Sequence, residues 1–146
     1  MDSSLIIIHN ILRWIMLPLL LFVLLRSYSG WFGDKPYTKL DKATGGALVG
    51  MAHLQLVLGL VLYFAVSPWF DMLKADFGGV MGDSVSRLKA IEHPLTMIIA
   101  VVLIQVGRTL SKKKTENTAK FKTVAIYTSI ALVLILSRQI NWVFPG

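Results

Sequence analysis

Three histidines are the residues of this chain best suited to chemistry, and each lies in a different apolar stretch. His9 lies in the first stretch, His53 in the second and His93 at the start of the third. Ionisable side chains inside a bilayer are costly and by default mark functional sites. A neutral imidazole can ligate a metal ion, including haem iron, or transfer a proton. The histidines are therefore the first candidates for a cofactor or proton site.

The depth of each histidine decides which of them can act together. At 1.5 Å per residue, His9 lies about 6 Å from the outer end of its helix, and His93 lies within a turn of that level. His53 lies about 10 Å from the opposite, cytoplasmic boundary. In an up-and-down bundle the first and third helices face each other diagonally. We therefore expect His9 and His93 to hold a flat macrocycle such as haem b as axial ligands, with His53 as an alternative ligand or serving a second cofactor or a quinone.

Basic residues near these histidines could pair with the anionic groups of such a cofactor. Arg13 lies one helical turn below His9 on the same face, and Arg138 lies at the outer end of the last stretch. Lys89 flanks the last histidine. Arginine pairs with carboxylates through two parallel hydrogen bonds, which suits a haem propionate. Arg13 and Arg138 are thus the expected propionate partners, although Arg13 could instead pair with Glu92 or extend to the outer surface.

A second polar group surrounds His53. Gly46 and Gly50 lie on the same stripe, which would let a neighbouring helix, a macrocycle or a quinone ring approach closely. Gln105 and Tyr127 lie in the same inner half and could complete a polar pocket. The alternative is that His53 is a buried neutral residue bonded to Gln105.

The elements that must position these residues are membrane-spanning helices. The chain has 146 residues, of which 55% are apolar and only 16% charged, and its mean hydropathy is +0.65. A soluble domain commonly has about a quarter of its residues charged. A bilayer core about 30 Å thick requires about 20 apolar residues per helix. The sequence therefore predicts one all-α domain, an integral membrane four-helix bundle of up-and-down topology with spans at residues 5–25, 47–66, 91–107 and 123–140.

Basic residues indicate how these helices are oriented. Of fifteen Lys and Arg residues, four lie in the first loop and six in the third, and these two loops share one side. The positive-inside rule places both loops in the cytoplasm and both termini outside. The net charge of +7 could suggest nucleic acid, but the charges lie in short loops between apolar stretches. We therefore expect a lipid bilayer as the partner and no nucleic acid.

The segment between the second and third stretches is rich in aromatic residues for a loop. Trp69, Phe70, Met72 and Leu73 are unusual in a solvated loop, so we expect a partly ordered segment at the outer interface that partly covers the bundle. Asp83 or Ser84 could cap a short helix within it.

Proline follows this segment. Pro94 removes a helical hydrogen bond to the carbonyl of Ala90 and is expected to bend the third helix.

Composition also excludes several kinds of site. The chain has no cysteine, so disulfides, Cys-ligated iron–sulfur clusters, zinc–thiolate sites and thioether haem attachment are excluded. The sequence contains no nucleophile–base pair, phosphate loop or paired carboxylates that would name a reaction. No catalytic residue is therefore expected, and whether the chain is an enzyme stays open.

Parts of the sequence resemble a family. The stretch from Gly50 to Gly59, GMAHLQLVLG, and the stretch Ile91-Glu92-His93-Pro94-Leu95 resemble small bacterial four-helix membrane proteins of the cytochrome b-like type. The opening His9-Asn10-x-x-Arg13-Trp14 extends the resemblance over most of the chain. The resemblance implies b-type haem held by intramembrane histidines in a bacterial inner membrane. Better-known four-helix cytochromes b usually offer four histidines for two haems, whereas this chain has three, which permits a second haem with one histidine ligand or none.

These observations favour a membrane b-type haem protein that relays electrons, as a small subunit of a respiratory or redox assembly. One alternative is a cofactor-free accessory or assembly subunit, in which the histidines are core residues. Another is a small proton or solute carrier that uses His53 and Gln105.

Overall fold

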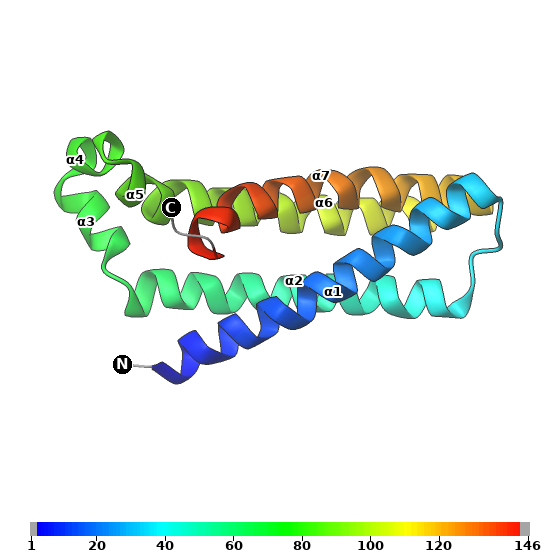
Figure 1. Ribbon diagram of the computed structural model, residues 1–146, viewed down its shortest axis with the longest axis horizontal. Helices are drawn as coiled ribbons and strands as arrows, with labels where there is room; N and C mark the ends of the chain where they lie inside the picture. Colours follow the sequence, from blue (N-terminus) through cyan, green and yellow to red (C-terminus); the bar gives the residue numbers. More distant parts are fainter. Residues whose placement is uncertain (1–2, 144–146) are drawn as a thin grey trace.

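Four long helices form most of the computed structural model, which describes residues 3–143 and the side chains of residues 4–138. They are α1 (Ser3–Gly33), α2 (Lys39–Val61), α6 (His93–Lys113) and α7 (Asn117–Val143) (Figure 1). The described residues contain no strand. Together with adjoining turns, these helices give four segments long and apolar enough to cross a membrane. The predicted all-α class is thus confirmed.

The predicted apolar ranges fall within these helical segments, but the helices are longer. The ranges 5–25 and 123–140 lie inside α1 and α7. The range 47–66 continues from α2 into a π-helical turn, η1 (Leu62–Val66), and 91–107 begins in a second such turn, η2 (Leu88–Glu92). Hydropathy finds only the apolar part of a helix, whereas polar residues at the ends are helical as well.

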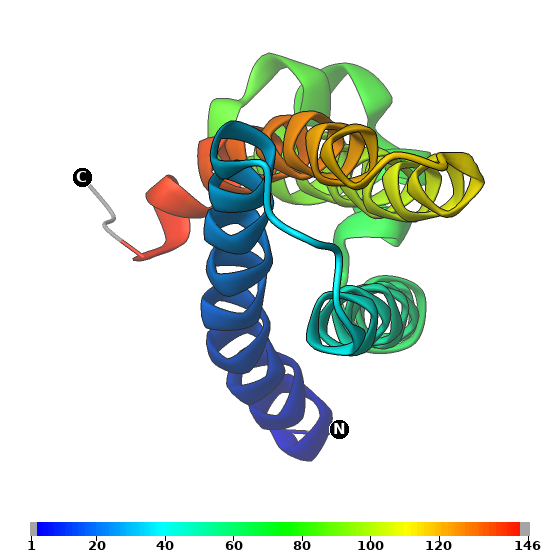
Figure 2. The same ribbon diagram turned by 90° about the vertical axis from the view of Figure 1, so that its right-hand side faces the viewer.

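The long helices contact one another in a ring. α1 contacts α2 and α7, and α6 contacts α2 and α7, so α1 and α6 lie across the ring from each other. α1 runs obliquely, from α7 at its C-terminal end toward α2 at its N-terminal end (Figures 1 and 2). Buried side chains from all four helices form the core: Met16, Leu20, Val23, Leu48, Ala52, Ala100, Val101, Ile104, Ala131 and Ile135. The outward faces carry exposed large apolar side chains, as lipid-facing surfaces do.

Close helix packing uses glycines other than the predicted pair. A Cβ atom placed on Gly107 would lie 2.6 Å from Cβ of Tyr127, so this glycine lets α6 approach α7. A Cβ on Gly46 would instead meet the Arg108 guanidinium at 3.2 Å, and one on Gly50 would meet nothing within 4 Å. The Gly46–Gly50 stripe, which could admit a helix, a macrocycle or a quinone ring, therefore faces the Arg108 side chain and open space.

Three short helices connect α2 to α6: α3 (Trp69–Ala75), α4 (Phe77–Gly82) and α5 (Ser84–Arg87). The predicted cap at Asp83 is confirmed, because its carboxylate accepts hydrogen bonds from the backbone N–H of Ser86 at 3.1 Å and from its hydroxyl at 2.6 Å. These hydrogen bonds lower the pKa of Asp83. The connecting segment is thus mostly helical.

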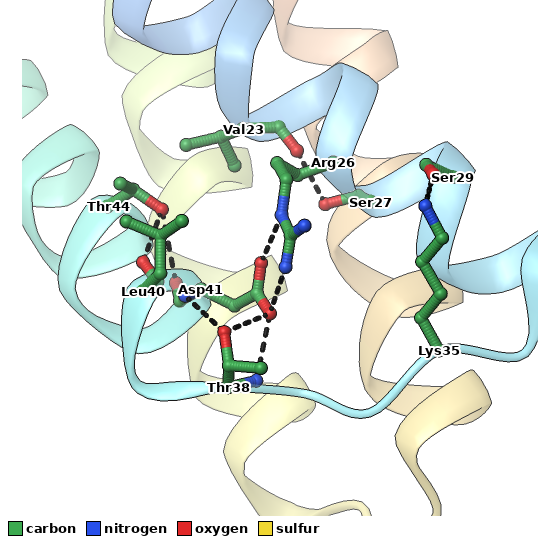
Figure 3. A network of polar contacts seen from close by, with 9 residues as sticks. All are labelled: Val23, Arg26, Ser27, Ser29, Lys35, Thr38, Leu40, Asp41 and Thr44. Carbon is green, nitrogen blue, oxygen red and sulfur yellow. Dashed lines mark hydrogen bonds and ion pairs between the residues drawn. The ribbon is translucent and has the colours of Figure 1, made fainter.

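At the opposite end of the molecule, a partly buried ion pair joins α1 to α2 (Figure 3). Nε and Nη2 of Arg26 each donate to a different carboxylate oxygen of Asp41, both at 2.9 Å. Thr38 caps α2, since its side chain accepts from the Asp41 backbone N–H while Asp41 accepts from the Thr38 backbone N–H at 2.8 Å. From the sequence, Arg26 was counted only among the four basic residues of the first loop, and Asp41 was not considered.

Candidate functional site

A cavity of about 190 Å³ lies between α1, α2 and α6, next to the short connecting helices. His9 of α1 and His93 of α6 both line it, as the depth estimate predicted. The other walls are mostly apolar and include Met16, Leu56 and Ile104. A single water molecule needs only about 10–15 Å³, so the cavity has room for a ligand.

The position of His93 depends on an irregular stretch of helix. The π-helical turn η2 ends directly before His93, and Pro94 follows it and also lines the cavity. Pro94 leaves the carbonyl of Ala90 without its helical donor, as expected from the sequence. The Tyr63 hydroxyl, from the turn η1, donates to this carbonyl at 2.5 Å. A cross-helix hydrogen bond thus stabilises the distorted backbone that presents His93.

The position of His9 depends on α2. Nε2 of Gln55 donates to the backbone carbonyl of His9 at 3.1 Å. One turn further along α2, a Cβ atom on Gly59 would lie 3.4 Å from Cε1 of the His9 ring, so the ring packs closely on the helix backbone there. Nδ1 of His9 is buried and makes no hydrogen bond to any described residue.

Two cations lie near the histidines. Arg13 interacts electrostatically with both His9 and His93. Its guanidinium carbon lies 5.3 Å from the Trp14 ring centroid, and its buried Nε makes no hydrogen bond within the described part of the chain. Lys89 lines the cavity wall. An anionic group on a ligand would therefore meet Lys89 on the cavity wall, whereas Arg13 is not among the residues that line the cavity.

Arg138, the other cation expected near the cofactor, forms an ion pair with Glu92. Arg87 pairs with the same carboxylate at 2.8 Å. Glu92, considered from the sequence as a partner for Arg13, is therefore engaged by two other arginines. The structure places Arg138 next to the residue that precedes His93, at the edge of the site.

The third histidine lies apart from the cavity. His53 is exposed, and its Nε2 lies 2.9 Å from Oε1 of Gln105. Nε2 of Gln105 in turn donates to the Thr109 hydroxyl at 3.0 Å. Tyr127, grouped with these residues from the sequence, packs against Gly107 on the α6–α7 contact. The structure thus brings His53 and Gln105 together on the α2–α6 surface.

Sequence reasoning missed Gln55, Gly59 and Tyr63. One signal was available, because Gln55 and Gly59 are four residues apart in an otherwise apolar stretch and so share a helix face. The role of Tyr63 depends on the two π-helical turns, which the sequence pattern does not show.

The donor set limits the chemistry of the site. Among the residues that the structure describes, no three His, Cys, Asp or Glu side chains converge to hold a metal ion. Two imidazoles are nonetheless sufficient for the two axial positions of haem iron, since the macrocycle supplies the other ligands. Comparison of the chain with protein-family models, curated proteins and solved structures finds no significant match.

Proposed function

We propose that the chain is a membrane protein that binds one b-type haem and relays electrons, with His9 and His93 as axial ligands. One observation carries the proposal: two histidines from helices across the ring line the same, mostly apolar cavity. Intramembrane histidines need a functional reason because ionisable groups are costly in lipid. Two axial imidazoles would leave no iron position open for oxygen and so favour electron transfer.

The lining of the cavity supports this proposal, and its open side allows for its volume. The volume of about 190 Å³ is below the 300–1,000 Å³ typical of ligand pockets. A haem would therefore have to extend through the open side of the cavity. Nonpolar walls such as Met97 and Val101 suit the porphyrin face.

The charges around the cavity suit the haem propionates. Lys89 lies on the cavity wall. Arg13 acts electrostatically on both proposed ligands, and its buried Nε donates to no described residue. Arg138 would act at the edge of the site through Glu92. Bound haem would supply one-electron redox chemistry, while the chain would ligate it, neutralise its carboxylates and exclude water.

Absorption spectroscopy tests the proposal. Purified protein expressed with ample haem should show reducible b-type bands, and His9→Ala or His93→Ala should abolish or convert the low-spin spectrum. His53→Ala is the matched control and should leave the spectrum unchanged, because His53 lies outside the cavity. Loss of the spectrum in the His53→Ala variant, with His9 replaceable, would show that the ligand pair is wrong. A colourless protein would favour the cofactor-free accessory subunit instead.

We further propose an up-and-down bundle in a bacterial inner membrane, within a redox assembly that could include a quinone. The chain has no native cysteine, so single cysteines at Ser4 and Thr115 can be probed on intact cells with an impermeant thiol reagent. Labelling at Ser4 alone is expected if the termini lie outside. Labelling at Thr115 alone would reverse the orientation.

A further inference from the structure

We infer that Gln55 is a positioning residue for His9: its Oε1 accepts a hydrogen bond from Nδ1–H and leaves Nε2 facing the cavity. The hydrogen bond can be tested without any cofactor. Its consequence for iron ligation rests on the proposed function.

The Gln55 side chain is already held beside His9. Gln55 is only 8% exposed, and its Nε2 donates to the His9 backbone carbonyl at 3.1 Å. This bond uses the amide nitrogen and leaves the amide oxygen for another donor. Oε1 is buried and makes no hydrogen bond within the described residues.

The His9 ring offers the complementary group. Its Nδ1 is likewise buried without a hydrogen bond to any side chain or backbone that the structure describes. The Gln55 side chain interacts with this imidazole. A buried polar atom without a partner carries a desolvation penalty. A hydrogen bond from the ring N–H to Oε1 would remove two such penalties at once.

Gly59 packs against the ring on the same face of α2. The ring carbon between the two nitrogens, Cε1, lies 3.4 Å from the position of a Cβ on Gly59. Gln55 and Gly59 are one helical turn apart, so together they form a seat for the imidazole on one face of α2. Since Nδ1 is buried in this seat and His9 lines the cavity, Nε2 is the nitrogen that remains for a ligand.

Orientation of this kind matters for iron ligation. Metal-binding histidines almost always donate their second ring N–H to an oxygen, which fixes the tautomer and raises the basicity of the coordinating nitrogen. A coordinating nitrogen that donates its electron pair more strongly stabilises ferric iron relative to ferrous iron. Gln55 would therefore set both the geometry and the redox potential of the site.

Nitrogen-15 NMR of histidine side chains in the haem-free protein tests the hydrogen bond directly. His9 should be the Nδ1–H tautomer, and Gln55→Leu should shift its population toward Nε2–H. Gln55→Glu keeps an oxygen that can accept from Nδ1–H and should retain the original tautomer. The chain offers a matched control in Gln105→Leu, which should alter only the signals of His53, since Gln105 contacts that histidine. An unchanged His9 tautomer in Gln55→Leu would overturn the inference.

The haem-loaded protein tests the consequence. Gln55→Leu should weaken haem binding about 10- to 100-fold and make the midpoint potential more positive, whereas Gln105→Leu should change neither. Bound haem with an unchanged potential in Gln55→Leu would refute the role of Gln55 at the ligand. Failure of the wild-type protein to bind haem would instead refute the proposed function, and the NMR result would still decide whether the hydrogen bond exists.

Discussion

Removing the Asp41 carboxylate should strongly destabilise the contact between α1 and α2. This carboxylate accepts two hydrogen bonds from Arg26, one from the Thr38 backbone N–H and one from the Thr38 hydroxyl. The Asp41 side chain is 4% exposed and that of Arg26 is 29% exposed. Asp41→Ala would therefore leave a partly exposed guanidinium without its partner.

The structure sets the expected magnitude. Breaking a fully buried ion pair by removing one partner costs about 3–5 kcal/mol, and loss of the interaction with the helix cap adds about 1 kcal/mol. Partial exposure of Arg26 lets solvent offset some of this loss. We expect Asp41→Ala to lower the free energy of unfolding by about 3 kcal/mol. Arg26→Met should have a similar effect. The loss of stability in the double variant should be smaller, by about 2 kcal/mol, than the sum of the losses in the two single variants.

Reversible unfolding in detergent or bilayers provides the assay, arranged as a double-mutant cycle. The exposed pair of Asp71 and Lys74, whose charged atoms are 3.6 Å apart, is the matched control and should show coupling near zero. A coupling energy for Arg26 and Asp41 below about 0.5 kcal/mol, the level of a surface pair, would refute the reasoning.

Three further predictions follow from local geometry. Gly107→Ala should force α6 and α7 apart and destabilise the protein by about 1–3 kcal/mol, whereas Gly50→Ala, which meets open space, should be neutral or stabilising in the same unfolding assay. Tyr63→Phe should cost about 1–3 kcal/mol by leaving a buried carbonyl unpaired; a neutral result would show that water replaces the hydroxyl. Because hydrogen bonds from Ser86 lower the pKa of Asp83, its cap should contribute stability at neutral pH that is lost as pH falls through the lowered value. Amide exchange in α5 as a function of pH would show this loss, and Asp83→Ala should remove the pH dependence.

The four long helices could be predicted from the sequence because apolar length alone determines whether a segment can span a bilayer. Their ends could not, since residues 39–46 are helical but carry charges and glycines. The capping box of Thr38 and Asp41 was readable from the sequence in principle. Its connection to Arg26 was not, because it depends on the crossing of α1 and α2.

The pairing of His9 and His93 in one cavity could be predicted because both lie near the same end of their helices, and depth follows directly from residue number. The rotation of each helix about its axis does not follow so simply. The π-helical turns η1 and η2 each shift the register of the faces that follow them. The contributions of Tyr63 and Gln55 depend on that rotation, as does the placement of His53 outside the cavity.

The cavity itself argues for a ligand. In an enclosed protein core, each Å³ of empty volume costs about 24 cal/mol, which for about 190 Å³ gives an upper limit of about 4–5 kcal/mol, because this cavity is open on one side. Larger side chains at positions such as Ala52 or Ala100 could have reduced it, yet both are alanines that line its wall. A ligand that binds only the folded state offsets this cost, by about 2.7 kcal/mol at a free concentration 100 times Kd. At that concentration, haem should therefore raise the free energy of unfolding of the wild-type protein by about this amount and leave the His93→Ala variant far less affected. Equal unfolding curves with and without haem would show that the cavity is not the haem site.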